Sequence, residues 1–278
     1  MSDVCCWGIS REWTHSPHRE FDDAEILRLT AKHLEAMGFL VSLLSPEAVA
    51  EAGQQVPPSI FLMCERRQIL RRLRRWEVGG VRLVNAPSAV LNTYRRRMLL
   101  LFKKEAIPFP PSIVVPTHRP GYHSLWPVWV KRADVHNTQD GDVVFALTED
   151  ALHGALRALA QRGIRHAVLQ KHIAGDLIKF YGVGDPARLQ GRTPWFRWFY
   201  HRHQALAGHP FDPGLLATLA QQAAAALGLE VYGGDAIASE GGGLVLIDLN
   251  AWPSFALYRE EASAQIASYL QQRFTRGG

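Results

Sequence analysis

Three oxygen-bearing side chains gather near the end of the chain, in the stretch GGDAIASEGGGLVLIDLNAWPSF that begins at Gly233. Asp248 and Asn250 stand two residues apart, so on a β-strand their side chains leave the same face. Asp235 precedes a glycine-rich turn, and a hairpin would lay it beside them. Mg²⁺ takes oxygen ligands and needs only one or two carboxylates besides phosphates and waters. The stretch therefore predicts a magnesium site, with Mn²⁺ as an alternative ion.

The simpler explanation of Asp235 and Asp248 is that each caps a turn, which aspartates commonly do. Both residues, however, stand at the ends of otherwise apolar strands. A carboxylate in such a place costs free energy if it has no partner. This cost favours the metal interpretation over the capping one.

The same stretch resembles the C-terminal motif of the ATP-grasp enzymes, where an acidic residue on one strand is followed by an acidic-x-Asn run and a proline. Asp235 and the run Asp248-Leu249-Asn250-Ala251-Trp252-Pro253 match that arrangement. The resemblance implies ATP and Mg²⁺ as cofactors, with Asp235, Asp248 and Asn250 as metal ligands. It also implies an α/β (α+β) ATP-grasp fold, in which a Rossmann-like N-terminal domain precedes two α+β subdomains that clamp ATP.

Two basic segments upstream extend the resemblance. VRLVNAPSAVLNTYRRRMLLLFKKEAIPFPPS looks like the family's link into its central domain, where a basic residue reaches the ATP phosphates. Arg96 takes that place, or Arg95 in the neighbouring register; most members have lysine, but arginine also clamps phosphate. WVKRADVHNTQDGDVVF resembles a strand lysine and the lid that follows it, so Lys131 is implied to contact the α- and β-phosphates. The lid spans residues 134–142, and its candidate ligands are His136, Asn137 and Thr138.

The segment VLQKHIAGDLIKFYGVG resembles the family's adenine hinge. The resemblance implies that adenine lies beside Gln170, Lys171, His172 and Ile173. Asp176 is the candidate for the ribose, and Lys179 is implied to face the phosphates or the acceptor.

Three functions are compatible with this resemblance. Most ATP-grasp enzymes phosphorylate a carboxylate and let an amine displace the phosphate, as ribosomal-protein glutamate ligases, glutathione synthetases and D-alanine ligases do. A smaller branch, the inositol trisphosphate kinases, phosphorylates a hydroxyl, and this chain resembles it locally at His136-Asn137-Thr138 and at the DLNAWP run. We expect a carboxylate–amine ligase acting through an acyl phosphate, with the kinase as the alternative. A nucleotide-binding module without turnover is the third hypothesis.

Residues 185–211 are rich in Arg, Trp, His and Pro and have no clear counterpart in either branch. Their basic side chains could bind a carboxylate or phosphate near the metal, although a solvated basic connection is the alternative. Arg202 ends a predicted strand of aromatics, so Arg202 and Lys179 are the predicted catalytic residues. His201 and His203 lack a third ligand at a suitable spacing, which argues against zinc.

The elements that would position these residues fall into three domains. Apolar strands alternate with helices in the first, which predicts a small parallel α/β sheet. A helix over 89–104 and a proline-rich hinge lead into the second, which holds the lid and the adenine hinge. The third contains the predicted hairpin and a helix that starts at Asp212-Pro213 and stops at Gly228. The predicted boundaries are 1–88, 89–172 and 173–278.

Composition agrees with an enzyme of this size. The chain has 278 residues, 47% hydrophobic and 21% charged, with a net charge of +5 that is compatible with a small anionic substrate. The run RRQILRRLRRW places Ile69, Leu70, Leu73 and Trp76 at helical spacing. It therefore predicts a packed helix with a solvated cationic face rather than a nucleic-acid site. The oligomeric state is open.

Three cysteines, Cys5, Cys6 and Cys64, do not form a disulfide framework or a zinc pattern, and we expect buried thiols. The sequence has no cationic run before an apolar stretch at its start and no long apolar window. We expect a cytoplasmic protein without membrane contact.

Overall fold

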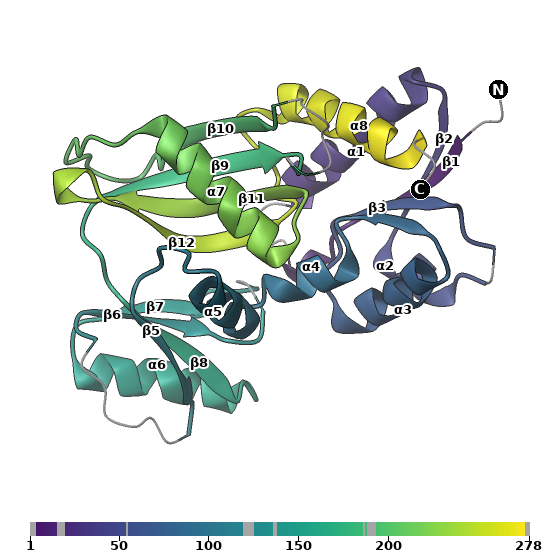
Figure 1. Cartoon of the computed structure of the whole chain (residues 1–278). Helices are drawn as coiled ribbons and strands as arrows, with labels where there is room; N and C mark the ends of the chain where they lie inside the picture. The colour runs from purple at the N-terminus through teal and green to yellow at the C-terminus, as the bar shows by residue number, and fades with distance from the viewer. Residues whose placement is uncertain are drawn as a thin grey trace.

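A computed structural model describes most of the chain, in three four-stranded sheets with helices on their faces (Figure 1). The residues that the structure describes are 4–15, 20–53, 55–118, 125–135, 138–185, 187 and 193–275. None of the helices within these ranges has both the length and the apolarity of a membrane span.

The N-terminal sheet is parallel, with the strand order β2-β1-β3-β4, as the alternation of strands and helices predicts. Its strands are β1 (Val4–Ile9), β2 (Phe39–Leu44), β3 (Ser59–Leu62) and β4 (Arg82–Val84). Its helical elements are η1 (Trp13–His15), α1 (Glu20–Ala36), α2 (Pro46–Glu51) and α3 (Arg67–Val78). Helix α2 was not predicted, although Ser45 caps it and Pro46 starts it. Of the three thiols expected to be buried, Cys6 and Cys64 are, whereas Cys5 is exposed on the other face of β1.

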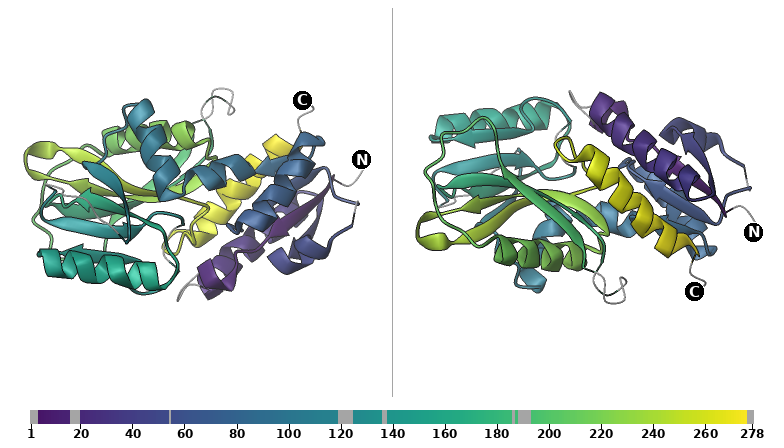
Figure 2. Two further views of the ribbon diagram at one scale, coloured as in Figure 1. Left: turned by 90° about the horizontal axis from the view of Figure 1, so that it is seen from below. Right: turned by 90° about the horizontal axis from the view of Figure 1, so that it is seen from above.

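The last helix, α8 (Arg259–Thr275), packs on the N-terminal sheet's own helix α1 (Figure 2). Ile266 and Leu270 of α8 share one buried cluster with Ile26 and Leu34 of α1. The end of the chain therefore completes the core of its beginning.

A break divides the segment 89–104, which the sequence predicts as one helix. The structure has α4 (Pro87–Asn92) and α5 (Arg95–Lys104) instead. Tyr94 leaves the helical conformation, with φ −58° and ψ 123°, and its hydroxyl donates to the carbonyl of Glu65 at 2.6 Å. The helix restarts at Arg95, which changes the directions in which the arginines after it point.

The central sheet is antiparallel and has the order β5-β8-β6-β7. Its strands are β5 (Ser112–Pro116), β6 (Val128–Arg132), β7 (Val143–Ala146) and β8 (His166–Lys171). Helix α6 (Glu149–Gln161), capped by Thr148, covers one face, where Val128, Val130 and Leu169 are buried. Because strand side chains alternate, Trp129, Lys131 and Gln170 lie on the opposite face.

The C-terminal sheet has the order β10-β9-β11-β12 and is also antiparallel. Its strands are β9 (Asp176–Val183), β10 (Trp195–Tyr200), β11 (Val231–Ala238) and β12 (Leu244–Ala251), with the turn η2 (Glu240–Gly242) before β12. Helix α7 (Pro213–Leu227) lies across one face (Figure 1), begins at the predicted cap Asp212 and ends at Gly228, whose φ is +78°. Part of the other face is left for the site, since Tyr181 and Val183 of β9 pack in the buried cluster that contains residues of α8.

Candidate active site

A cavity of about 320 Å³ lies between the central and C-terminal sheets, within the size range of small-molecule sites. The central sheet and the segment after β8 line it with Trp129, Lys131, Val143, Gln170, Lys171, His172, Ile173 and Gly175. The C-terminal sheet contributes Leu177, Asp235, Ile237, Ile247 and Asp248, and α5 contributes Arg95. The cavity thus combines apolar side chains with charged and polar ones, and the acidic pair and Arg95 belong to the charged group.

The predicted hairpin pairs Asp235 of β11 directly with Asp248 of β12. The next pair joins Ala236 to Leu246, so Ile247 is an extra residue in a β-bulge. The bulge lets Leu246 and Leu249 both enter the core while Ile247 and Asp248 line the cavity. Asn250 lies beside this pair, half-buried and opposite Gly233.

Three cations from three different elements converge on the two carboxylates. Lys179 Nζ of β9 donates to Asp235 Oδ1 at 2.7 Å, and Arg95 Nη2 donates to Asp248 Oδ2 at 3.3 Å. Lys131 Nζ donates to the carbonyl of Ile247, the bulge residue, at 3.2 Å. Positive charge therefore surrounds the acidic pair at one end of the cavity.

Lys131 is held in an unfavourable environment for a cation. Only 7% of the residue is exposed, and burial lowers the pKa of its amine to about 8. Attraction by Asp248 and Asp235 offsets this only in part, and Arg95 repels the ammonium. An anion stabilises the charged form of a buried amine, so Lys131 suits a phosphate.

Arg95, not Arg96, lines the cavity. The sequence favoured Arg96 as the phosphate-binding residue and gave Arg95 as the alternative, so the structure favours the alternative. Arg95 is 3% exposed and also donates to the carbonyls of Arg132 and Val135, at 3.2 and 3.1 Å. Arg96 is exposed and lines a different cavity. The cause is the break at Tyr94, which starts α5 at Arg95.

The predicted adenine residues Gln170, Lys171, His172 and Ile173 all line the cavity. The backbone amides of Lys171 and His172 donate to the carbonyls of Pro111 and Pro127, which fixes the strand end. Trp129 Nε1 donates to His172 Nδ1 at 3.1 Å, and the Trp129 ring lies 4.8 Å from that of Phe145. Aromatic side chains thus border the cavity beside the end of β8.

The described residues of the lid segment form hydrogen bonds and ion pairs with one another and with the end of β6. The amide and hydroxyl of Thr138 donate to Asp142 Oδ2 at 2.6 and 2.9 Å, so this predicted ligand is bound to the lid's own carboxylate. Arg132 holds Asp134 and Asp142, and Asp142 is fully buried. Burial by itself raises the pKa of Asp142, but the hydrogen bonds from Thr138, Arg162 and Arg132 lower it overall. His136 and Asn137 lie outside the described residues.

Two further predicted residues lie away from the cavity. The buried carboxylate of Asp176 accepts from the amides of Ala207 and His209 at 2.7 and 2.8 Å, so it holds a loop rather than facing a ribose. Arg202 is exposed just beyond β10 and does not line the cavity. Of the other arginines between 185 and 211, Arg197 pairs with Glu261, and Arg188 and Arg192 lie outside the described residues.

The metal candidates fit Mg²⁺ better than a metal that needs a complete protein cage. Over the described ranges, no group of three His, Cys, Asp or Glu side chains is placed to hold an ion. Asp235, Asp248 and Asn250 supply two carboxylates and an amide, and Mg²⁺ ordinarily takes its other ligands from phosphates and water. The donor set therefore matches an ion that arrives with a nucleotide.

The end of β12 is fixed to the N-terminal sheet by a buried charged cluster that sequence reasoning missed. Arg11, after β1, pairs with Asp23 at 3.1 Å and with Glu65. It also donates to the carbonyls of Ala251 and Trp252, just after Asn250. Trp129 was also missed, although its place two residues before Lys131 on a strand predicts a shared face.

No protein-family model and no curated protein matches the sequence. Solved structures match over nearly its whole length. A D-alanine–D-alanine ligase from Bacillus anthracis complexed with ATP is 11% identical, with a TM-score of 0.70 over 99% of this chain and 96% of that one. D-alanyl-alanine synthetase A from Vibrio cholerae is 13% identical, with a TM-score of 0.73 over 99% and 98%. A RimK domain ATP-grasp protein from Sphaerobacter thermophilus is 16% identical, with a TM-score of 0.69 over 96% and 99%.

Proposed function

Because the chain has the ATP-grasp fold that its sequence predicts, we propose that it is an ATP- and magnesium-dependent ligase. It would act in the cytoplasm and join a small carboxylic acid to an amine. One observation carries the proposal. The paired carboxylates of Asp235 and Asp248 stand at the charged end of a cavity between two sheets, within reach of Arg95, Lys131 and Lys179. That combination suits a nucleotide triphosphate and its metal ion.

The residues that line the cavity support a proposed position for each part of ATP. We place adenine against the strand end Gln170–Ile173 and the Trp129 side chain. Lys131 then binds the α- and β-phosphates, because phosphate charge compensates the cost of burying its ammonium. Arg95 lies nearer Asp248 and binds the terminal phosphate.

Asp235, Asp248 and Asn250 would hold Mg²⁺, which neutralises charge on the transferring phosphoryl group when it is bound. Lys179 and Arg95 orient the two carboxylates through the hydrogen bonds described above. In the proposed reaction, an acid's carboxylate oxygen bonds to the γ-phosphorus as its bond to ADP breaks. The amine then bonds to the acyl carbon, phosphate leaves and the amine's proton passes to solvent.

The experiment is a measurement of ADP release with pooled amino acids, small carboxylic acids and inositol phosphates, each with and without hydroxylamine. The ligase proposal predicts ADP release that depends on a carboxylic acid and a hydroxamate product in the presence of hydroxylamine. Transfer of phosphate to an inositol hydroxyl would replace the ligase by a kinase. Tight ATP binding with no ADP release in any pool would replace it by a binding module.

A further inference from the structure

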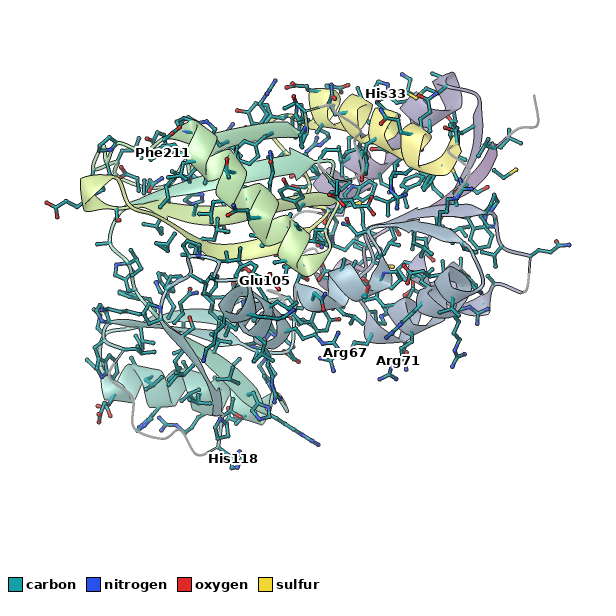
Figure 3. All side chains as sticks on the ribbon, in the orientation of Figure 1. His33, Arg67, Arg71, Glu105, His118 and Phe211 are labelled. Atoms are coloured by element: carbon teal, nitrogen blue, oxygen red, sulfur yellow. The ribbon has the colours of Figure 1, made fainter. Side chains whose placement is uncertain are left out.

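A second and larger cavity, of about 680 Å³, lies outside the proposed active site. We call it the arginine cavity, because five arginines from three parts of the fold line it. Its residues are Arg67, Arg71, Leu91, Tyr94, Arg96, Arg97, Leu100, Ala133, Asp134, Gly163, Arg165 and His166. The set joins α3 and the α4–α5 segment on one side to the central sheet on the other. Figure 3 shows Arg67 and Arg71 extending from α3 on the lower side of that helix.

The arginines of this cavity lack the counter-charges that neighbouring arginines have. On α3 and just before it, Arg66 pairs with Glu47 at 3.1 Å, and Arg72 donates to a backbone carbonyl. Within the described part of the chain, none of the five cavity arginines forms an ion pair, and all five are exposed. Arg67 stacks over Tyr94, with its guanidinium 5.0 Å from the ring centroid. Helix α3, which was predicted to have a solvated cationic face, therefore directs Arg67 and Arg71 into a concave surface.

The single carboxylate that lines the cavity does not neutralise these charges. Asp134 is bound by Arg132, with Nε and Nη2 at 2.8 and 3.0 Å from its two oxygens. Leu91, Tyr94 and Leu100 supply apolar surface between the guanidinium groups. A concave surface with charge of one sign concentrates ions of the other sign. The cavity thus combines an uncompensated positive wall with a place for a ligand's carbon skeleton.

The arginine cavity and the proposed active site are separate but adjacent. They share no lining residue. Consecutive residues at the start of α5 divide between them, because Arg95 enters the active site whereas Arg96 and Arg97 enter the arginine cavity. The amide of Arg96 donates to the carbonyl of Ala133 at 3.2 Å, two residues beyond Lys131. A ligand in one site therefore contacts the same helix start and the same strand end as a ligand in the other.

We propose that the arginine cavity binds a small oligoanion, a molecule that carries two or more phosphate or carboxylate groups, while the nucleotide occupies its own site. Guanidinium groups bind both kinds of anion through paired N–H donors, and several are needed only for a multiply charged ligand. The volume lies within the small-ligand range, and a concave pocket suits such a ligand better than an extended nucleic-acid duplex. This inference does not depend on which reaction the enzyme catalyses.

The test uses two probes, fructose 1,6-bisphosphate for phosphate and tricarballylate for carboxylate, in isothermal titration calorimetry. The full chain is first saturated with Mg²⁺ and a non-hydrolysable ATP analogue, so that the active site is filled. The same titration without nucleotide shows whether the probe competes for that site. The variant R71E/R165E reverses one charge on each wall, and R74E/R157E is its matched control. Arg74 and Arg157 are exposed residues of the same helix α3 and of α6, outside the cavity.

We expect saturable binding of at least one probe to the nucleotide-loaded protein, and the probe that binds more tightly assigns the anion. The R71E/R165E variant should bind that probe about tenfold more weakly or worse, because each lost charged hydrogen bond lowers affinity by roughly tenfold. R74E/R157E should stay within about twofold, which is the range of a screened remote charge. No saturable binding of either probe, or equal weakening in the two variants, would overturn the proposal.

Thermal melting checks that both variants are folded. If the protein binds no nucleotide, the proposed function fails, but the titration still tests this cavity.

Discussion

Arg95 of α5 donates to Asp248 of β12 across 3.3 Å, although the two residues are 153 positions apart in the sequence. The hydrogen bond crosses from the helix that leads into the central sheet to the hairpin of the C-terminal sheet. It joins the candidate phosphate-binding arginine to a candidate metal ligand. Each side chain therefore helps to position the other. Because their proposed roles differ, a variant of Asp248 should mainly lower turnover, and a variant of Arg95 should mainly weaken nucleotide binding.

Asp248→Asn should lower turnover by roughly 100-fold or more while the protein stays folded. The amide oxygen still accepts a hydrogen bond from Arg95, but the negative charge that would hold Mg²⁺ is lost. Glu240→Gln is the control, since Glu240 is exposed in the turn of the same hairpin. ADP release and the melting temperature are measured for both. Near-normal turnover of D248N would refute the metal assignment.

Arg95→Met should raise the KM for ATP by about tenfold to 100-fold, because a buried charged donor to phosphate is removed. Arg96→Met should change it by no more than about twofold, since Arg96 lies outside the active-site cavity. Steady-state kinetics with varied ATP compares the two neighbours directly. A larger effect of R96M than of R95M would restore the first choice made from the sequence.

Nucleotide affinity should fall as the pH rises through about 8, the pKa to which burial lowers the Lys131 amine. Below that pH the amine already has its proton, so binding of phosphate takes up none. Above it, binding must draw a proton from solvent, and affinity falls by about tenfold per pH unit until the pKa of the complex is reached.

Calorimetry of ADP binding in two buffers of different ionisation enthalpy measures this proton uptake. Lys131→Arg should keep affinity but lose the uptake, because a guanidinium stays charged. Lys131→Met should lose both. Unchanged proton uptake in K131R would show that another group titrates.

Gly234→Ala should lower the free energy of unfolding by about 1–3 kcal/mol. A Cβ at this position would lie 2.5 Å from the backbone oxygen of Asp248 and 2.6 Å from Phe180 Cζ, so β12 would have to shift. Gly154→Ala is the matched control, because its Cβ would meet open space in helix α6. That change should raise stability by about 0.5–1 kcal/mol. Urea denaturation of both variants is the measurement, and equal stability of G234A and the parent would contradict the close approach.

Local signals explain which parts were predictable from the sequence. Helix α7 has its cap, its proline and its terminal glycine within its own segment, and its bounds were predicted correctly. The pairing of Asp235 with Asp248 was predicted because one short turn joins their strands. In both cases the interactions that decide the structure join residues close in sequence.

The parts that were predicted wrongly depend on distant contacts. The break between α4 and α5 contains neither glycine nor proline, and the hydroxyl of Tyr94 bonds to Glu65 on another segment. The role of Asp176 could not be predicted without knowing that its carboxylate binds the loop at 207–209. These contacts place Arg95 in the cavity and keep Asp176 out of it.

The position of α8 on α1 has a consequence for how the protein is made. Residues 259–275 are synthesised well after Ile26 and Leu34, yet they pack in the same buried cluster. The part of α1 that α8 covers is therefore shielded from water only after the intervening residues have been made, and until then it can contact other apolar surfaces. Truncation before Arg259 should accordingly leave that part of α1 uncovered and the protein prone to aggregate.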